Sequence, residues 1–137
     1  MSKFRGLKAS IPFVVGAAIM AVPPVMHQAL ADAASEVVNA QTHAGLAAAA
    51  TKIEGVHTHL HHALNCLVGP AGQGFDAKQM NPCAQAGSGA IPDTTDAAKK
   101  KKLEAAAAKA REGIAATDFA AAQKAASETA SMLTADE

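Results

Sequence analysis

The sequence contains no tryptophan and no tyrosine, and only four phenylalanines among 137 residues. Proteins that bind single-stranded nucleic acids usually stack the bases on aromatic side chains. A nucleic-acid interface also needs an excess of basic residues, whereas the twelve basic residues here are matched by twelve acidic ones. We therefore predict no nucleic-acid partner. The chain also lacks a nucleophile elbow, a P-loop and a dinucleotide-binding fingerprint, so we do not expect an enzyme.

Long apolar segments are also absent, except near the start of the chain. There a basic stretch is followed by an apolar run, residues 9–22, and by a small-x-small cleavage site that ends at Ala31. This is the pattern of a secretory signal peptide, and the run is shorter than the roughly 20 residues that span a bilayer. We predict that residues 1–31 are cleaved and that residues 32–137 form a single domain in the periplasm or outside the cell. We expect no membrane contact after cleavage.

Cysteine is scarce, with Cys66 and Cys83 both in the predicted exported part. An even number of cysteines in an oxidising compartment favours a disulfide. The alternative is that both thiolates bind a metal, which needs a reducing or protected environment.

Strand-forming residues are few, and alanine, the best helix former, is the commonest residue. Residues 69–92 are rich in glycine and proline and predict a long loop between two helical regions. We predict an all-α fold: a small antiparallel four-helix bundle of two helical hairpins joined by this loop, with one disulfide. The alternative is a three-helix bundle with one long first helix from about Ser35 to Val68, because no proline interrupts that segment.

Two patterns in the first helical region bear on this choice. Thr51 and Glu54 have the spacing of a capping box, which starts a helix and favours a turn just before it. Leucine or isoleucine recurs every seven residues and predicts a buried stripe: Leu46, Ile53, Leu60 and Leu67.

Histidine is the residue in excess, with four of the six packed into "HTHLHH", residues 57–62. On a helix, His57 and His61 share one face, and Glu54 lies one turn before them. Pairs at this spacing bind zinc and similar ions. A hairpin would return His43 to the level of His57, so that His43, Glu54, His57 and His61 supply three nitrogens and one oxygen. Such a set suits Zn²⁺, Ni²⁺ or Cu²⁺.

The other two histidines of this segment point in different directions. His59 is expected nearly opposite His61. His62 lies on the flank of the helix, one turn before Cys66, and with reduced cysteines these two would form a pair suited to copper or zinc. The C-terminal half has no histidine, which excludes a di-iron centre of the bundle type.

A small, exported, helical chain with these histidines resembles the small periplasmic metal-binding bundle proteins of Gram-negative bacteria. The residues that carry the resemblance all lie in the first half: His43, His57, His59, His61 and His62. The resemblance implies sequestration or carriage of a divalent transition metal in the periplasm. The alternative is a non-catalytic structural or stress-related periplasmic module, whose histidines form a partner surface or a pH-responsive surface.

Overall fold

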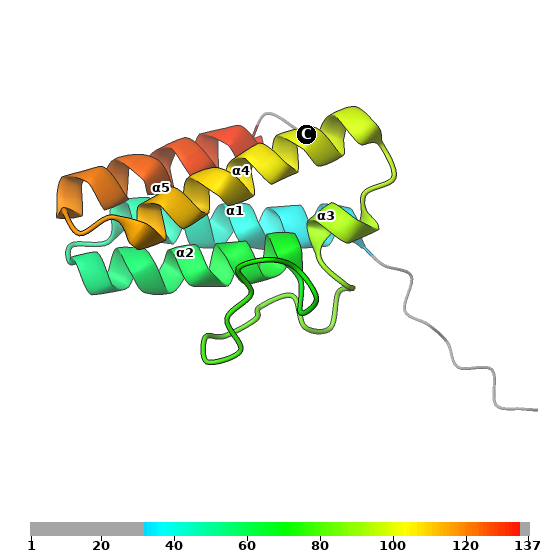
Figure 1. Ribbon diagram of the computed structural model, residues 1–137, viewed down its shortest axis with the longest axis horizontal. Coiled ribbons are helices and arrows are strands. Elements are labelled where there is room, and N and C mark those ends of the chain that lie inside the picture. Colours follow the sequence, from blue (N-terminus) through cyan, green and yellow to red (C-terminus); the bar gives the residue numbers. More distant parts are fainter. Residues whose placement is uncertain (1–31, 135–137) are drawn as a thin grey trace, which may run out of the picture.

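The structure is a computed structural model that describes residues 32–134, so the predicted signal peptide lies outside the described residues. The helices in chain order are α1 (Ala33–Ala49), α2 (Ile53–Val68), α3 (Ala90–Asp93), α4 (Ala97–Ala115) and α5 (Phe119–Thr134). The four long helices form an antiparallel bundle, and α3 is a single short turn near one end (Figure 1). The predicted all-α bundle of two hairpins is therefore confirmed. The three-helix alternative is excluded, because the backbone is not helical between α1 and α2.

Each long helix packs mainly against two neighbours, and α2 and α5 also touch across the bundle. Helices α1 and α2 form the first hairpin and α4 and α5 the second, and the hairpins stack with α1 beside α5 and α2 beside α4. The core contains a few large aliphatic side chains among many alanines. The largest of them are leucines: Leu60, Leu64, Leu67, Leu103 and Leu133. Because alanine adds little bulk, the helix backbones come close together. At Gly113 a Cβ atom would lie 2.5 Å from the Leu60 side chain.

The first hairpin turns directly after α1, without a glycine or a proline. Ala50 and Lys52 have extended backbone conformations. The capping box predicted at Thr51 is wrong, because Lys52 is the N-cap of α2 and makes no side-chain capping bond. Instead Gln123 on α5 donates from Nε2 to the carbonyls of Ala48, at 2.9 Å, and of Ala50, at 3.2 Å. These carbonyls lie at a helix end, where the last oxygens lack helical partners.

The predicted leucine stripe is correct only within α2. Leu60 and Leu67 are fully buried, whereas Leu46 is 46% exposed. The seven-residue spacing runs across the turn, so Leu46 belongs to a different helix, and the period of one continuous helix does not apply to it.

The long loop is held to α2 by covalent and hydrogen bonds. Cys66 and Cys83 form the predicted disulfide. The neighbouring side chain, the buried Asn65, donates to the carbonyls of Asp76 and Met80 at 3.0 and 3.1 Å and accepts the Asp76 backbone N–H at 2.9 Å. These contacts order the part of the loop before α3, which has no regular secondary structure. The short helix α3 itself was not predicted from the sequence.

The two ends of this loop meet at Gly69 and Gly89. Both have positive φ angles, 66° and 119°. A Cβ atom on Gly69 would lie 1.6 Å from the Ser88 carbonyl oxygen, and one on Gly89 would lie 2.6 Å from the Gly69 nitrogen. The contact therefore requires glycine at both positions.

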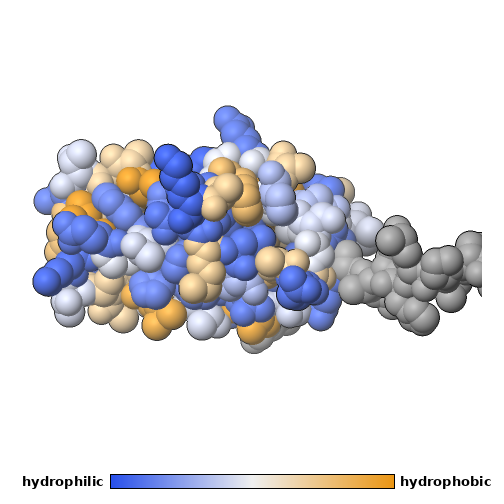
Figure 2. Space-filling view, turned by 90° about the horizontal axis from the view of Figure 1, so that it is seen from below, coloured by the Kyte–Doolittle hydropathy of each residue, from blue (hydrophilic) through white to orange (hydrophobic). Residues whose placement is uncertain are grey.

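The face formed by α2 and the loop shows hydrophilic and hydrophobic residues interspersed (Figure 2). On this face the apolar residues form small groups rather than one continuous apolar area. Within residues 32–134, no helix combines the length and the apolar character needed to cross a membrane.

Candidate metal centre

Three histidines from two helices meet in the first hairpin: His43 on α1, and His59 and His62 on α2. One ligand nitrogen from each ring lies within 4.8 Å of the other two. The ring centroids are 5.1 to 5.6 Å apart, and the His62 ring stands edge-on to both other rings. We call these three residues the histidine cluster. Among the described residues, no other group of three or more such side chains comes together in this way.

Two ring nitrogens of the cluster are as far apart as two nitrogen ligands of one metal ion. The Nδ1 atoms of His43 and His59 lie 3.4 Å apart. In a tetrahedral site with metal–nitrogen bonds of about 2.1 Å, two ligand nitrogens also lie about 3.4 Å apart. A hydrogen bond between neutral imidazoles uses one N–H and one bare lone pair. At least one of these nitrogens is therefore unprotonated and able to bind an ion.

The positions of the three residues follow from helix geometry. His59 and His62 are three residues apart and so project from adjacent turns of one helix face. The hairpin places α1 against that face, and His43 then lies beside both. His62 is buried, while His43 and His59 are half-buried. The cluster therefore lies between the core and the surface, with one side near solvent.

The surroundings favour the neutral form of His43 and His62. Burial lowers the pKa of His62, and the neighbouring His43, His59 and His61 lower it further. Burial and His59 likewise lower the pKa of His43. Neutral imidazole is the form that binds metals. In addition, the His62 Nδ1 atom is buried and has no hydrogen-bond partner among the described residues.

The three side chains of the predicted row on α2 lie in different surroundings. The His57 Nε2–H donates to the Ala116 carbonyl at 3.0 Å, beyond the end of α4. His61 Nδ1 lies 3.9 Å from a carboxylate oxygen of Asp76 in the long loop and, like His62 Nδ1, has no hydrogen-bond partner among the described residues. Glu54 is exposed in the first turn of α2.

The structure therefore joins His43 and His62, two of the predicted ligands, to His59, which was expected on a separate face. It does not place Glu54, His57 and His61 in a common group of ligands with His43. Metal binding by that row stays a prediction. The sequence did hold a signal for the cluster, because His59 and His62 have helical i, i+3 spacing. The sequence does not show on which side of α2 the helix α1 packs.

The disulfide confirms the favoured prediction for the two cysteines and excludes the alternative in which they bind a metal. Both sulfurs are bonded, and the described residues contain no free cysteine. In this state the Cys66 sulfur supplies no thiolate to pair with His62. The alternative of two cysteine ligands is therefore contradicted, and the candidate centre consists of nitrogen ligands alone.

Comparison of the chain with protein-family models, with curated proteins and with solved structures found no match in any of the three. The fold and the site define the class: a small all-helical protein with a three-histidine cluster, to which no family is assigned.

Proposed function

We propose that the protein binds one divalent transition-metal ion through His43, His59 and His62. The observation that carries the proposal is the convergence of three ligand nitrogens, one from each ring, within 4.8 Å. Imidazole ligands suit zinc, copper and nickel, and three histidines leave a further coordination position for water. The unpaired, buried Nδ1 of His62 supports the proposal, because a buried polar atom normally has a partner.

We propose that this binding serves sequestration or carriage of the metal in the periplasm or outside the cell, without catalysis. The Cys66–Cys83 disulfide supports this location, because disulfides persist in oxidising compartments. The half-buried positions of His43 and His59 support exchange of the ion, since a fully enclosed site would retain it.

Isothermal titration calorimetry with Zn²⁺, Cu²⁺ and Ni²⁺ tests the proposal. We expect the purified protein to bind one ion. His59→Ala should weaken binding about tenfold or more, which corresponds to at least about 1.4 kcal/mol. His57→Ala, a histidine of the same helix outside the cluster, is the matched control and should bind like the parent protein.

Two results would contradict the proposal. Equal heats for the parent protein and His59→Ala would show that the cluster does not bind the ion. Loss of binding in His57→Ala alone would instead favour the row of Glu54, His57 and His61.

A further inference from the structure

A second candidate binding site lies at the loop end of the bundle. A cavity of about 390 Å³ opens between the end of α2, the start of the loop, α3 and α4. Its volume falls in the range of about 300 to 1,000 Å³ that is typical of small-ligand pockets. Val68 and Ala71 line one side and Ile91 and Pro92 another, so the walls are apolar. No histidine lines the cavity, so it is distinct from the candidate metal centre.

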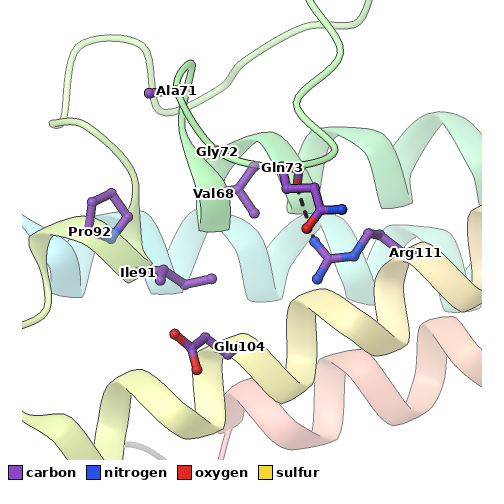
Figure 3. A pocket seen from close by; sticks show the side chains of 8 residues that line it. All are labelled: Val68, Ala71, Gly72, Gln73, Ile91, Pro92, Glu104 and Arg111. Atoms are coloured by element: carbon purple, nitrogen blue, oxygen red, sulfur yellow. Dashed lines mark hydrogen bonds between the residues drawn. The ribbon is translucent and has the colours of Figure 1, made fainter.

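Two charged side chains of α4 complete the cavity, Glu104 and Arg111 (Figure 3). The Arg111 Nη1 donates to the Gln73 carbonyl at 3.1 Å, which holds the guanidinium at the cavity. Among residues 32–134, no carboxylate lies within ion-pair distance of Arg111. The nearby Lys109 and Lys124, in contrast, both pair with glutamates. A guanidinium has five N–H donors, so the Gln73 contact leaves most of them for a ligand.

Glu104 gives the cavity an opposite charge at its other end. It lies seven residues before Arg111, so the two backbone positions are about 10.5 Å apart along the helix. The two side chains form no ion pair with each other, and Figure 3 shows the Glu104 carboxylate on the Ile91 side and the Arg111 guanidinium on the Gln73 side. The cavity is thus apolar in the middle, positive at one end and negative at the other.

We propose that this cavity binds a small monocarboxylate with an apolar body. The carboxylate accepts charge-assisted hydrogen bonds from Arg111, which are stronger than those between neutral groups. The apolar body packs against Val68 and Ile91. Glu104 lies beside the far end of the ligand, where it favours a neutral or positively charged group and repels a second carboxylate.

Four compounds with six-carbon chains separate these contributions. They are hexanoate, 6-aminohexanoate, hexylamine and adipate, each titrated into the ¹⁵N-labelled protein and followed by NMR. We expect hexanoate and 6-aminohexanoate to shift the backbone amides of Gln73, Ile91 and Arg111. Hexylamine and adipate should bind about tenfold more weakly or worse. Equal binding of hexylamine and hexanoate, or shifts confined to other parts of the protein, would overturn the proposal.

Variants of the two charged residues test the same site independently. Arg111→Gln should weaken hexanoate binding about tenfold, and Arg111→Lys should restore part of it, because lysine keeps the charge but not the planar fork. Lys124→Gln removes a positive charge from α5 and should change nothing. Glu104→Gln should strengthen adipate binding. Unchanged hexanoate binding by a folded Arg111→Gln variant, with its helicity checked by circular dichroism, would refute the role of Arg111.

Discussion

Replacing Glu36 by glutamine should stabilise the protein above pH 7. It should also remove the part of the pH dependence of stability that comes from the Glu36 carboxyl group. Glu36 lies on α1 and is fully buried. Its Oε1 accepts the Gly89 backbone N–H at 2.9 Å, and its Oε2 has no hydrogen-bond donor among the described residues. The nearby Asp93 carboxylate accepts the Ser88 backbone N–H at 2.7 Å. As an ion, Glu36 would therefore place a second negative charge in a buried position next to the first.

These surroundings raise the pKa of Glu36 from 4.5 to about 7. Burial is the largest cause, and the carboxylates of Asp93 and Asp32 add to it, while the Gly89 hydrogen bond acts in the opposite direction. In the protonated form, Glu36 can donate to Asp93, which removes the unpaired oxygen. Glutamine has the same shape, and it can donate to Asp93 and accept from Gly89 at every pH.

Proton linkage determines whether the protonation of Glu36 raises or lowers the stability as the pH changes. Between pH 4.5 and 7 the folded state binds more protons than the unfolded state, so the free energy of unfolding falls as the pH rises. A pKa rise from 4.5 to about 7 corresponds to about 3 kcal/mol. The contribution of Glu36 is therefore most favourable below pH 4.5 and is lost by about pH 8. The change is large against a typical total stability of about 5 to 15 kcal/mol.

Urea denaturation of the parent protein and Glu36→Gln at several pH values between 4.5 and 8 measures this effect. The signal must be far-UV circular dichroism, because the chain has no tryptophan or tyrosine. The unfolding free energy of the variant minus that of the parent should rise by about 3 kcal/mol across this range. The histidines are common to both proteins and cancel in the difference. Glu104→Gln, at an exposed glutamate of α4, is the control for the loss of one carboxylate from the protein. If the difference in unfolding free energy between Glu36→Gln and the parent does not change with pH, the reasoning is refuted.

Three further predictions concern stability. Gly45→Ala should raise the unfolding free energy by up to about 1 kcal/mol, because a Cβ atom there meets nothing within 4 Å. Gly113→Ala should lower it by about 1 kcal/mol or more, because the Cβ atom there would lie 2.5 Å from a buried leucine. Thermal melts of the two variants should therefore shift in opposite directions, and shifts of the same sign would contradict the packing argument. Asn65→Asp keeps the acceptor but loses both donated bonds to loop carbonyls, and should cost about 2 to 3 kcal/mol in urea denaturation; an unchanged midpoint would show that these bonds do not hold the loop. Removing the disulfide by Cys66→Ala and Cys83→Ala should cost about 3 kcal/mol, and the parent protein should show no reactive thiol, so two reactive thiols would contradict the bridge.

The helical class, the long loop and the disulfide could be predicted because each has a local signal. Alanine favours helix wherever it occurs, glycine and proline mark the loop, and only one pairing of two cysteines is possible. The turn after α1 has only a weak local signal, because the Thr51 and Glu54 spacing that favoured it does not cap α2 and the residues of the turn would also continue a helix. It is held in part by Gln123, which is more than 70 residues away in the sequence. That contact exists only after the second hairpin has packed against the first.

The composition of the candidate site was predictable, but its arrangement was not. Helix α2 lies between α1 and α4, and histidines project toward both neighbours. His57 contacts the Ala116 carbonyl beyond α4, whereas His59 and His62 contact His43 on α1. The helical period separates these two groups of side chains, but it does not show which neighbouring helix lies on which side. That depends on the order in which the helices surround the core, which the packing of the whole bundle sets.

The histidine cluster lowers the stability of the fold, and this loss is relevant to its function. A buried position in a helix interface is ordinarily filled by an aliphatic side chain, and here His62 occupies one with an unpaired Nδ1. Burial and the neighbouring rings lower the pKa of His62, so an acidic medium that protonates it destabilises the fold. An alanine or a leucine would avoid both costs. A bound cation would instead give the ring nitrogens a partner. The three imidazoles at this helix interface could hold a metal ion, and binding would offset part of the cost that they impose on the fold.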